Sequence, residues 1–205
     1  MIKIILFDCD GPIVKRDKYF SQRLMDLGIK LDNAKIADFF NNEFLLCETG
    51  KADLKEELAK RIKTWGWEKS LDELLDFWFS GEAKIDLQMI ESIKQLRQKG
   101  IECFLVTDQE KYRAEYLWKI LGLEKVLDGI YPSYKVGFLK RNVEFWEHVY
   151  KNFNQYSKEE ILVWDDEKEI INVAKEFGFN AELYTDFADF KISMKNIYTT
   201  MLIKT

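Results

Sequence analysis

The chain has 205 residues, and its 47% apolar content supplies a sizeable core and excludes an intrinsically disordered protein. The 31 basic and 36 acidic residues leave a net charge of −5, which argues against a nucleic-acid partner. The single histidine, His148, excludes zinc sites with two histidine ligands, and the ten glycines are too widely spaced for a glycine-rich nucleotide-binding loop.

The first predicted element is a strand over residues 2–7. Its nearly continuous, β-branched apolar run is typical of a strand buried on both faces in a parallel sheet. Residues 15–81 show no further strand pattern, because their apolar residues recur at helical spacing. Two matches to the capping-box pattern, Asp53 with Glu56 and Ser70 with Glu73, also mark helix starts. We therefore predict a four-helix insertion over this range.

From residue 86 onward, predicted helices and strands alternate. Helical periodicity begins after Asp86, a plausible N-cap, and recurs over 112–120, 145–150 and 170–177. Apolar runs predict strands over 101–106, 126–131, 161–164 and 181–184. This alternation predicts an α/β fold with a doubly wound, mostly parallel sheet, in which 1–14 and 82–205 form the core domain and 15–81 a helical cap. The tail after Tyr184 is ambiguous and suggests a further strand near 197–203.

Polar residues that could carry chemistry follow the strands predicted over 2–7 and 101–106. Asp8 and Asp10 come directly after the first strand, where one carboxylate can attack an electrophile while the other moves a proton. The same residues with Gly11 also make an ordinary turn. Thr107 and Asp108 follow the strand over 101–106, where a hydroxyl can bind a phosphate oxygen or simply cap a helix.

Two further clusters complete the pattern. Lys140 precedes the helix over 145–150 and can neutralise phosphate charge, although a solvated surface lysine is the simpler interpretation. Asp165 and Asp166 end the strand over 161–164, and two adjacent like charges there are hard to explain without a cation. Hard carboxylate oxygens suit Mg²⁺. Because ligands of open α/β sheets bind at the carboxyl ends of the strands, all four clusters point to one site.

The order Asp-x-Asp, Thr, Lys and Asp-Asp resembles the motifs of the haloacid dehalogenase-like superfamily, over about residues 2–185. The helical insertion resembles the small cap of its phosphatase-like subfamily. The resemblance implies a phosphatase in which Asp8 is the nucleophile that forms an aspartyl-phosphate and Asp10 is the general acid and base. It further implies that Thr107 holds a phosphate oxygen and that Lys140 neutralises charge.

The resemblance also implies a Mg²⁺ cofactor. Its ligands would be the Asp8 carboxylate, the Asp10 backbone carbonyl and Asp166, with Asp165 in a supporting position. The second aspartate of the first motif favours phosphoryl over halide chemistry. Two alternatives stay open: a phosphomutase with the same motifs, and a family member turned into a binding or regulatory module.

Three residues depart from the family pattern. Pro12 stands where threonine is usual and removes one loop N–H group. Arg141 replaces a proline after Lys140, and Lys135 remains a second candidate for the motif lysine. Asp108 replaces an asparagine and places a negative charge near the phosphate. We expect this charge to be offset by Lys140, by Lys111 or by a substrate hydroxyl.

The remaining candidates receive simpler interpretations. We expect His148 to be structural or exposed, and Cys9 to act through its backbone N–H. Cap aromatics at helical spacing indicate cap core more often than a substrate wall; they are Phe39, Phe40, Phe44, Trp65, Trp67 and Trp78.

The partner implied by the motifs is a small phosphorylated metabolite. Three scattered cysteines and the lack of a long apolar run predict a cytoplasmic protein with free thiols, bound to no membrane. The sequence leaves the oligomeric state open.

Overall fold

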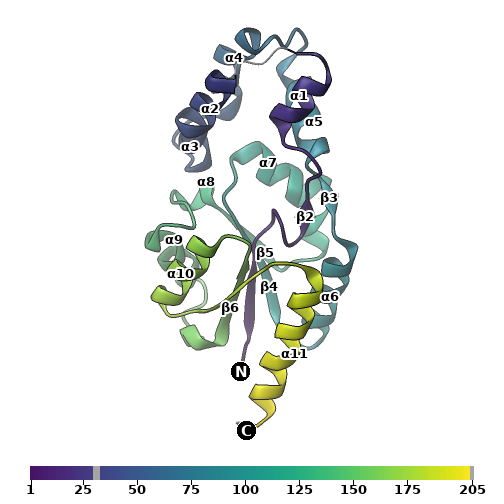
Figure 1. The fold of residues 1–205 in the computed structure, drawn as a ribbon. Helices are drawn as coiled ribbons and strands as arrows, with labels where there is room; N and C mark the ends of the chain where they lie inside the picture. Colours follow the sequence, from purple (N-terminus) through teal and green to yellow (C-terminus); the bar gives the residue numbers. More distant parts are fainter. Residues whose placement is uncertain (30–32, 204–205) are drawn as a thin grey trace.

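The computed structural model describes residues 1–29 and 33–203, which form the two lobes seen in Figure 1. The larger, core lobe contains a five-stranded parallel sheet in the order β5-β4-β1-β6-β7. Its strands are β1 (Ile4–Phe7), β4 (Glu102–Thr107), β5 (Gly129–Pro132), β6 (Ile161–Asp165) and β7 (Asn180–Leu183). The predicted α/β fold with a parallel sheet is confirmed.

The central strand β1 is buried along its whole length, as its continuous apolar sequence predicts. It pairs in parallel with β4 on one side and β6 on the other. Helices α6 (Leu87–Gln98) and α11 (Phe187–Ile203) cover one face, and α9 (Val143–Tyr150) and α10 (Lys168–Phe177) cover the other (Figure 1). Asp86 caps α6 as predicted, since its carboxylate accepts hydrogen bonds from the N–H groups of Gln88 and Met89.

Several short helical segments complete the described part of the core lobe. The helix predicted over 112–120 is an α-helix, α7 (Lys111–Glu115), that continues as a π-helical turn over Tyr116–Ile120. Helix α8 (Ser133–Val136) follows β5 directly. Short 3₁₀ turns at Leu123–Lys125 and Lys158–Glu160 lead into β5 and β6.

The smaller, cap lobe lies between two short strands, β2 (Val14–Lys15) and β3 (Lys84–Ile85), which pair antiparallel at its base. It contains α1 (Phe20–Asp26), α2 (Asn33–Asn41), α3 (Glu43–Glu48), α4 (Leu54–Arg61) and α5 (Leu71–Gly81), with a 3₁₀ turn at Ile62–Trp65. The sequence predicts four helices here, whereas the described part of the lobe has five. Both predicted helix starts are present, since Asp53 caps α4 and Ser70 forms a capping box with Glu73.

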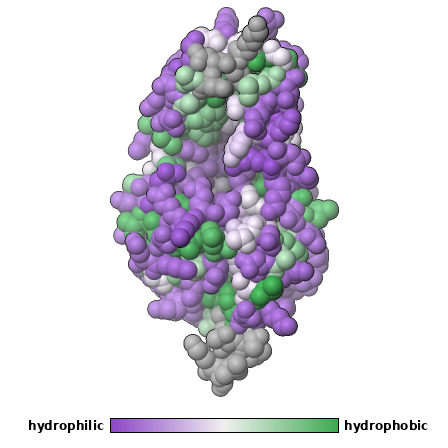
Figure 2. All heavy atoms as spheres, viewed as in Figure 1, coloured by the Kyte–Doolittle hydropathy of each residue, from purple (hydrophilic) through white to green (hydrophobic). Residues whose placement is uncertain are grey.

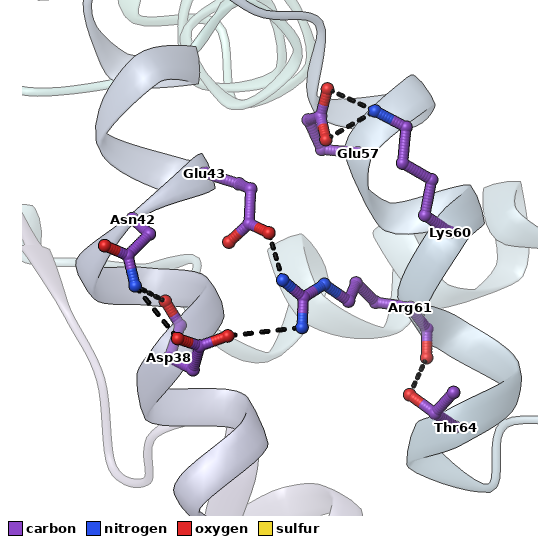
Figure 3. Close-up of polar contacts among 7 residues, drawn as sticks. All are labelled: Asp38, Asn42, Glu43, Glu57, Lys60, Arg61 and Thr64. Carbon is purple, nitrogen blue, oxygen red and sulfur yellow. Dashed lines mark hydrogen bonds and ion pairs between the residues drawn. The ribbon is translucent and has the colours of Figure 1, made fainter.

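A polar cluster joins α4 to α2 and α3 (Figure 3). The Arg61 guanidinium forms ion pairs with Asp38, at 3.2 Å, and with Glu43. Asn42 donates to the Asp38 carboxylate and to its backbone carbonyl. These contacts add to the apolar packing that orients α2 and α3, whose inner faces line the cavity described below.

The strand suggested near 197–203 is wrong, because that stretch is the end of α11. The helix starts upstream, where the Asp186 carboxylate accepts from the N–H groups of Ala188 and Asp189. Phe190 and Met194 then pack into the core, so tertiary contacts override the β-branched composition of the tail. Neither α11 nor any other helix within residues 1–29 and 33–203 has the length and apolar character needed to cross a membrane.

Candidate active site

The predicted motif residues meet at the carboxyl edge of the sheet. Asp8 follows β1, Thr107 ends β4 and Asp165 ends β6. Because β4, β1 and β6 are neighbouring parallel strands, their carboxyl ends lie side by side. The edge opens on a cavity of about 440 Å³ between the core lobe and the cap lobe.

Lys140 is the buried cation of this edge. It lies between α8 and α9, and its Nζ is 2.6 Å from Asp8 Oδ1 and 2.7 Å from Asp165 Oδ2. Burial opposes its charge, but the carboxylates of Asp8, Asp165 and Asp108 outweigh burial and raise the pKa of Lys140 well above its ordinary value. The other candidate, Lys135, is exposed and does not line the cavity.

Three carboxylates share the space around this lysine. Asp8, Asp165 and Asp166 each place an oxygen within 4.8 Å of the others. Asp165 is fully buried, and both its oxygens are engaged, one by Lys140 and one by the Glu167 N–H at 2.9 Å. Asp166 is exposed. Three carboxylates face one lysine, so a hard divalent cation fits the surplus negative charge, with Asp8 and Asp166 as its candidate ligands.

Gly11 lets the loop after β1 pass close to Asp166. Its φ of 91° lies in the left-handed region, which side chains rarely adopt. A Cβ at this position would lie 2.3 Å from Asp166 Oδ2. A side chain at residue 11 would therefore displace Asp166 from its place beside Asp8.

Asp10 is held by two side chains that the sequence did not single out. Gln109 Nε2 donates to Asp10 Oδ2 at 2.6 Å, and Arg113 Nη2 donates to Asp10 Oδ1 at 3.0 Å. Arg113 Nη2 also donates to the backbone carbonyl of Glu82 at 2.9 Å. Burial opposes the charge on Arg113, but the negative charges of Asp10, Cys9 and Glu82 and the hydrogen bond to Asp10 together outweigh it and raise the pKa of Arg113.

Lys140 partly offsets the charge of Asp108, as one of the three expectations has it: burial raises the pKa of Asp108, and the positive charge of Lys140 opposes this rise. Asp108 Oδ1 also accepts the backbone N–H of Lys140 at 2.9 Å, so it positions the loop that carries the lysine. Lys111 points elsewhere, with its Nζ 5.2 Å from the centre of the Tyr112 ring. Thr107 is buried and lines the cavity, and the N-cap of α7 is Glu110 rather than Thr107.

The cysteine between the two aspartates does not supply a second nucleophile. Cys9 is completely buried, and burial raises the pKa of its thiol well above the ordinary value. His148, the only imidazole of the chain, is exposed on α9 and does not line the cavity. The groups available for chemistry at this edge are therefore carboxylates, a lysine and a threonine hydroxyl, with Arg113 and Gln109 holding Asp10.

Comparison with known proteins gave matches to one family model and to several solved structures. The family model of the haloacid dehalogenase-like hydrolases matches residues 2–178. A predicted HAD-like family hydrolase from Porphyromonas gingivalis superposes with a TM-score of 0.79 at 20% identity, over 97% of this chain and 98% of that one. A search of curated proteins found no match.

Two further solved structures are similar at lower identity. A HAD family enzyme from Bacteroides thetaiotaomicron, in complex with magnesium and inorganic phosphate, has a TM-score of 0.77 at 19% identity and covers 93% of this chain and 99% of its own. The L-2-haloacid dehalogenase from Xanthobacter autotrophicus, with chloropropionic acid covalently bound, has a TM-score of 0.63 at 16% identity, with coverage of 91% and 79%. At these identities the likeness establishes a shared fold.

Proposed function

The chain belongs to the haloacid dehalogenase-like hydrolases, and from this premise we propose that it is a magnesium-dependent phosphatase acting on a small phosphorylated metabolite through an aspartyl-phosphate. The observation that carries the proposal is the buried contact of Lys140 with Asp8 and Asp165 beneath the cavity. An anionic nucleophile can approach an anionic phosphate only where cations cancel the repulsion.

In the first step, an Asp8 carboxylate oxygen attacks phosphorus, and the bond from phosphorus to the ester oxygen breaks. The proton that Asp10 carries moves to the leaving oxygen, so that an alcohol departs. The Asp10 carboxylate formed in this way is the group to which Arg113 and Gln109 donate. Thr107 lines the same cavity and would donate to a phosphate oxygen.

In the second step, the Asp10 carboxylate takes a proton from water, and the water oxygen attacks phosphorus. The bond from phosphorus to Asp8 breaks, which releases inorganic phosphate and regenerates the Asp8 carboxylate. Asp10 is then protonated for the next cycle. An aspartate at this position serves both steps, which favours phosphoryl transfer over halide displacement.

Asp8, Asp166 and the backbone carbonyl of Asp10 would hold Mg²⁺, while Asp165 keeps Lys140 in place. When bound, the ion supplies positive charge toward the phosphate oxygens. Two observations support this assignment: the surplus of carboxylate charge around Lys140, and the magnesium and phosphate bound in the Bacteroides thetaiotaomicron enzyme.

The decisive experiment measures phosphate release from p-nitrophenyl phosphate with Mg²⁺, with a strong chelator and with Asp8→Asn. We expect activity with Mg²⁺ alone and background release in the other two cases. Full activity in the chelator, or Asp8→Asn activity within about tenfold of the parent, would overturn the mechanism. Product analysis with a sugar phosphate separates hydrolysis from phosphomutase transfer.

Two further expectations belong to this proposal. We assign 1–14 and 82–205 to the core domain and 15–81 to the cap, which is supported by the β2–β3 pair at the base of the cap lobe. A cytoplasmic location is supported by three free cysteines, Cys9, Cys47 and Cys103, all of them buried.

A further inference from the structure

The cavity between the lobes has two ends of opposite character. Among the described residues, every one that the core lobe contributes to its lining is polar or charged, as Asp8, Thr107 and Lys140 are. Every apolar residue of the lining comes from the cap lobe; these are Tyr19, Phe20, Ile36, Phe40, Phe44 and Trp78. Figure 2 shows a hollow between the lobes, with apolar side chains over α2 and α3 beside it. A ligand whose phosphate occupies the core end therefore directs its other end toward aromatic rings.

Three of these rings form a packed wall. The ring centroids of Phe40 and Phe44 lie 5.0 Å apart, and that of Trp78 lies 5.5 Å from Phe40 and 5.6 Å from Phe44. These spacings lie in the range that aromatic pairs prefer. Phe40 and Phe44 are only half-buried although they belong to the cap core, so part of each ring remains open to the cavity.

The end of the cavity near the cap has few polar side chains among the described residues, and some of these already contact other residues of the chain. The cap contributes Arg16, Ser21 and Glu48, and Glu82, the first residue of the core range, contacts Phe20 of the cap. Glu82 accepts the Phe20 N–H at 2.9 Å, and the Arg16 guanidinium lies 4.5 Å from the centre of the Tyr19 ring. A polyol placed here would bury hydroxyl groups against rings with few partners, and each unpaired hydroxyl is costly.

We propose that the substrate is the phosphate monoester of an alcohol that carries an aromatic ring, with the ring against Phe40, Phe44 and Trp78 and the phosphate beside Asp8 and Lys140. This inference rests on the proposed function and names its substrate class. A cavity of about 440 Å³ has the size of a small-molecule site and accommodates one ring, a short linker and a phosphate.

The test compares three alkyl phosphates, so that the leaving oxygen stays chemically similar: 3-phenylpropyl phosphate, sorbitol 6-phosphate and ethyl phosphate. We expect kcat/KM for 3-phenylpropyl phosphate to exceed that for sorbitol 6-phosphate by about tenfold or more. Phe44→Leu and Phe44→Ala should lower the preference for 3-phenylpropyl over ethyl phosphate by about threefold to tenfold. Phe77→Leu is the matched control, because Phe77 is a half-buried cap ring on α5 that does not line the cavity.

The outcomes separate the two proposals. Hydrolysis of all three esters without an aromatic preference, or an equal loss for all of them in the Phe44 variants, would overturn the inference and leave the phosphatase standing. If no ester is hydrolysed, the proposed function fails and no substrate can be assigned. Calorimetric binding of 3-phenylpropylphosphonate against sorbitol 6-phosphate then tests only whether the cavity prefers an aromatic ligand. If the phosphonate binds more tightly than sorbitol 6-phosphate, and Phe44→Leu but not Phe77→Leu weakens that binding, the aromatic preference is supported. If the phosphonate binds equally or more weakly, the aromatic preference is refuted.

Discussion

Removing the guanidinium that holds Asp10 should slow proton transfer to the leaving group selectively. Arg113 is buried and donates through Nη2 to Asp10 Oδ1, at 3.0 Å, and to the Glu82 carbonyl. Its Nη1 is also buried and has no hydrogen-bond partner among the described residues. Arg113→Met keeps much of the side-chain length but removes every donor. The carboxylate that Asp10 becomes in the first step then loses one of its two side-chain partners.

The size of the effect follows from this contact. A hydrogen bond to a charged group contributes about 1.5–3 kcal/mol net. At 1.36 kcal/mol for each tenfold change in rate, this corresponds to about 10-fold to 150-fold in the step that forms the Asp10 carboxylate. General acid–base catalysis as a whole contributes about 10²–10⁴-fold, so Arg113→Met should leave part of it intact.

The assay uses two leaving groups. With ethyl phosphate, whose alkoxide must be protonated as it leaves, kcat for Arg113→Met should fall by about 10-fold to 150-fold. With p-nitrophenyl phosphate, which needs little protonation, formation of the aspartyl-phosphate should be nearly unchanged. In the second step the Asp10 carboxylate takes up a proton, so losing a donor that stabilises its charge should not slow hydrolysis of the intermediate, and no burst of p-nitrophenol is expected in rapid-mixing experiments.

Two variants complete this experiment. Gln109→Met removes the donor to the other Asp10 oxygen and should show the same dependence on leaving group. Arg97→Met is the control. Arg97 forms an ion pair with Asp128, with 2.6 Å between Nη2 and Oδ1, and neither residue lines the cavity. Equal losses with both esters, together with a lowered melting temperature, would mean that Arg113 acts only through stability and would refute this role.

Three further results are expected. Asp166→Ala should raise the Mg²⁺ concentration needed for half-maximal activity more than Asp165→Ala does. Asp165→Ala should instead lower the unfolding free energy by about 1.5–3 kcal/mol, because Lys140 loses one of its charged hydrogen-bond partners while it keeps Asp8. The reverse pattern in Mg²⁺ titration and urea unfolding would reassign the ligand. Asp108→Asn keeps an acceptor for the backbone N–H of Lys140 and removes a negative charge near the phosphate. KM for each ester should therefore fall or stay within about threefold of the parent value. A large, uniform rise in KM would contradict this account. Burial, reinforced by the charge of Asp108, raises the pKa of Glu48 from its ordinary value to about 8. The folded state therefore favours the protonated carboxyl. The stability that this protonated form contributes is present at low pH and is lost as pH rises through about 8. Melting temperatures between pH 5 and 9 should decline less steeply for Glu48→Gln than for the parent, and identical slopes would exclude Glu48 as the cause.

The core lobe was predictable because its signals are local. The apolar runs at 2–7, 101–106 and 161–164 become β1, β4 and β6, and their buried positions need apolar side chains on both faces. The tail was not predictable in the same way. Its β-branched residues near 197–203 favour a strand, but the cap at Asp186 and the packing of Phe190 lie upstream and decide for a helix.

The candidate site was predictable to the extent that its residues follow strands. Asp8, Thr107 and Asp165 come to one edge because parallel neighbours end together. Arg113 gave no such signal, because a charged residue within a helical stretch is typical of a solvated face. Arg113 and Asp10 are 103 positions apart, and the contact between them depends on how α7 packs beside the loop after β1. Only a cluster of charges near Thr107, from Asp108 to Arg113, hinted that this segment belongs to the site.

The cap aromatics show why a helical pattern cannot separate a core from a binding wall. Phe39 and Phe40 are neighbours in the sequence, yet Phe39 is fully buried in the cap while Phe40 is half-buried and lines the cavity. The same apolar stripe serves both purposes, because an α-helix turns about 100° at each residue and spreads adjacent side chains over a wide arc. What directs one part of that arc to the cavity is the orientation of α2 and α3. That orientation rests on the packing of the cap core, to which Arg61 of α4 adds ion pairs with Asp38 and Glu43. These contacts join residues 18 or more positions apart and leave no periodic trace in the sequence.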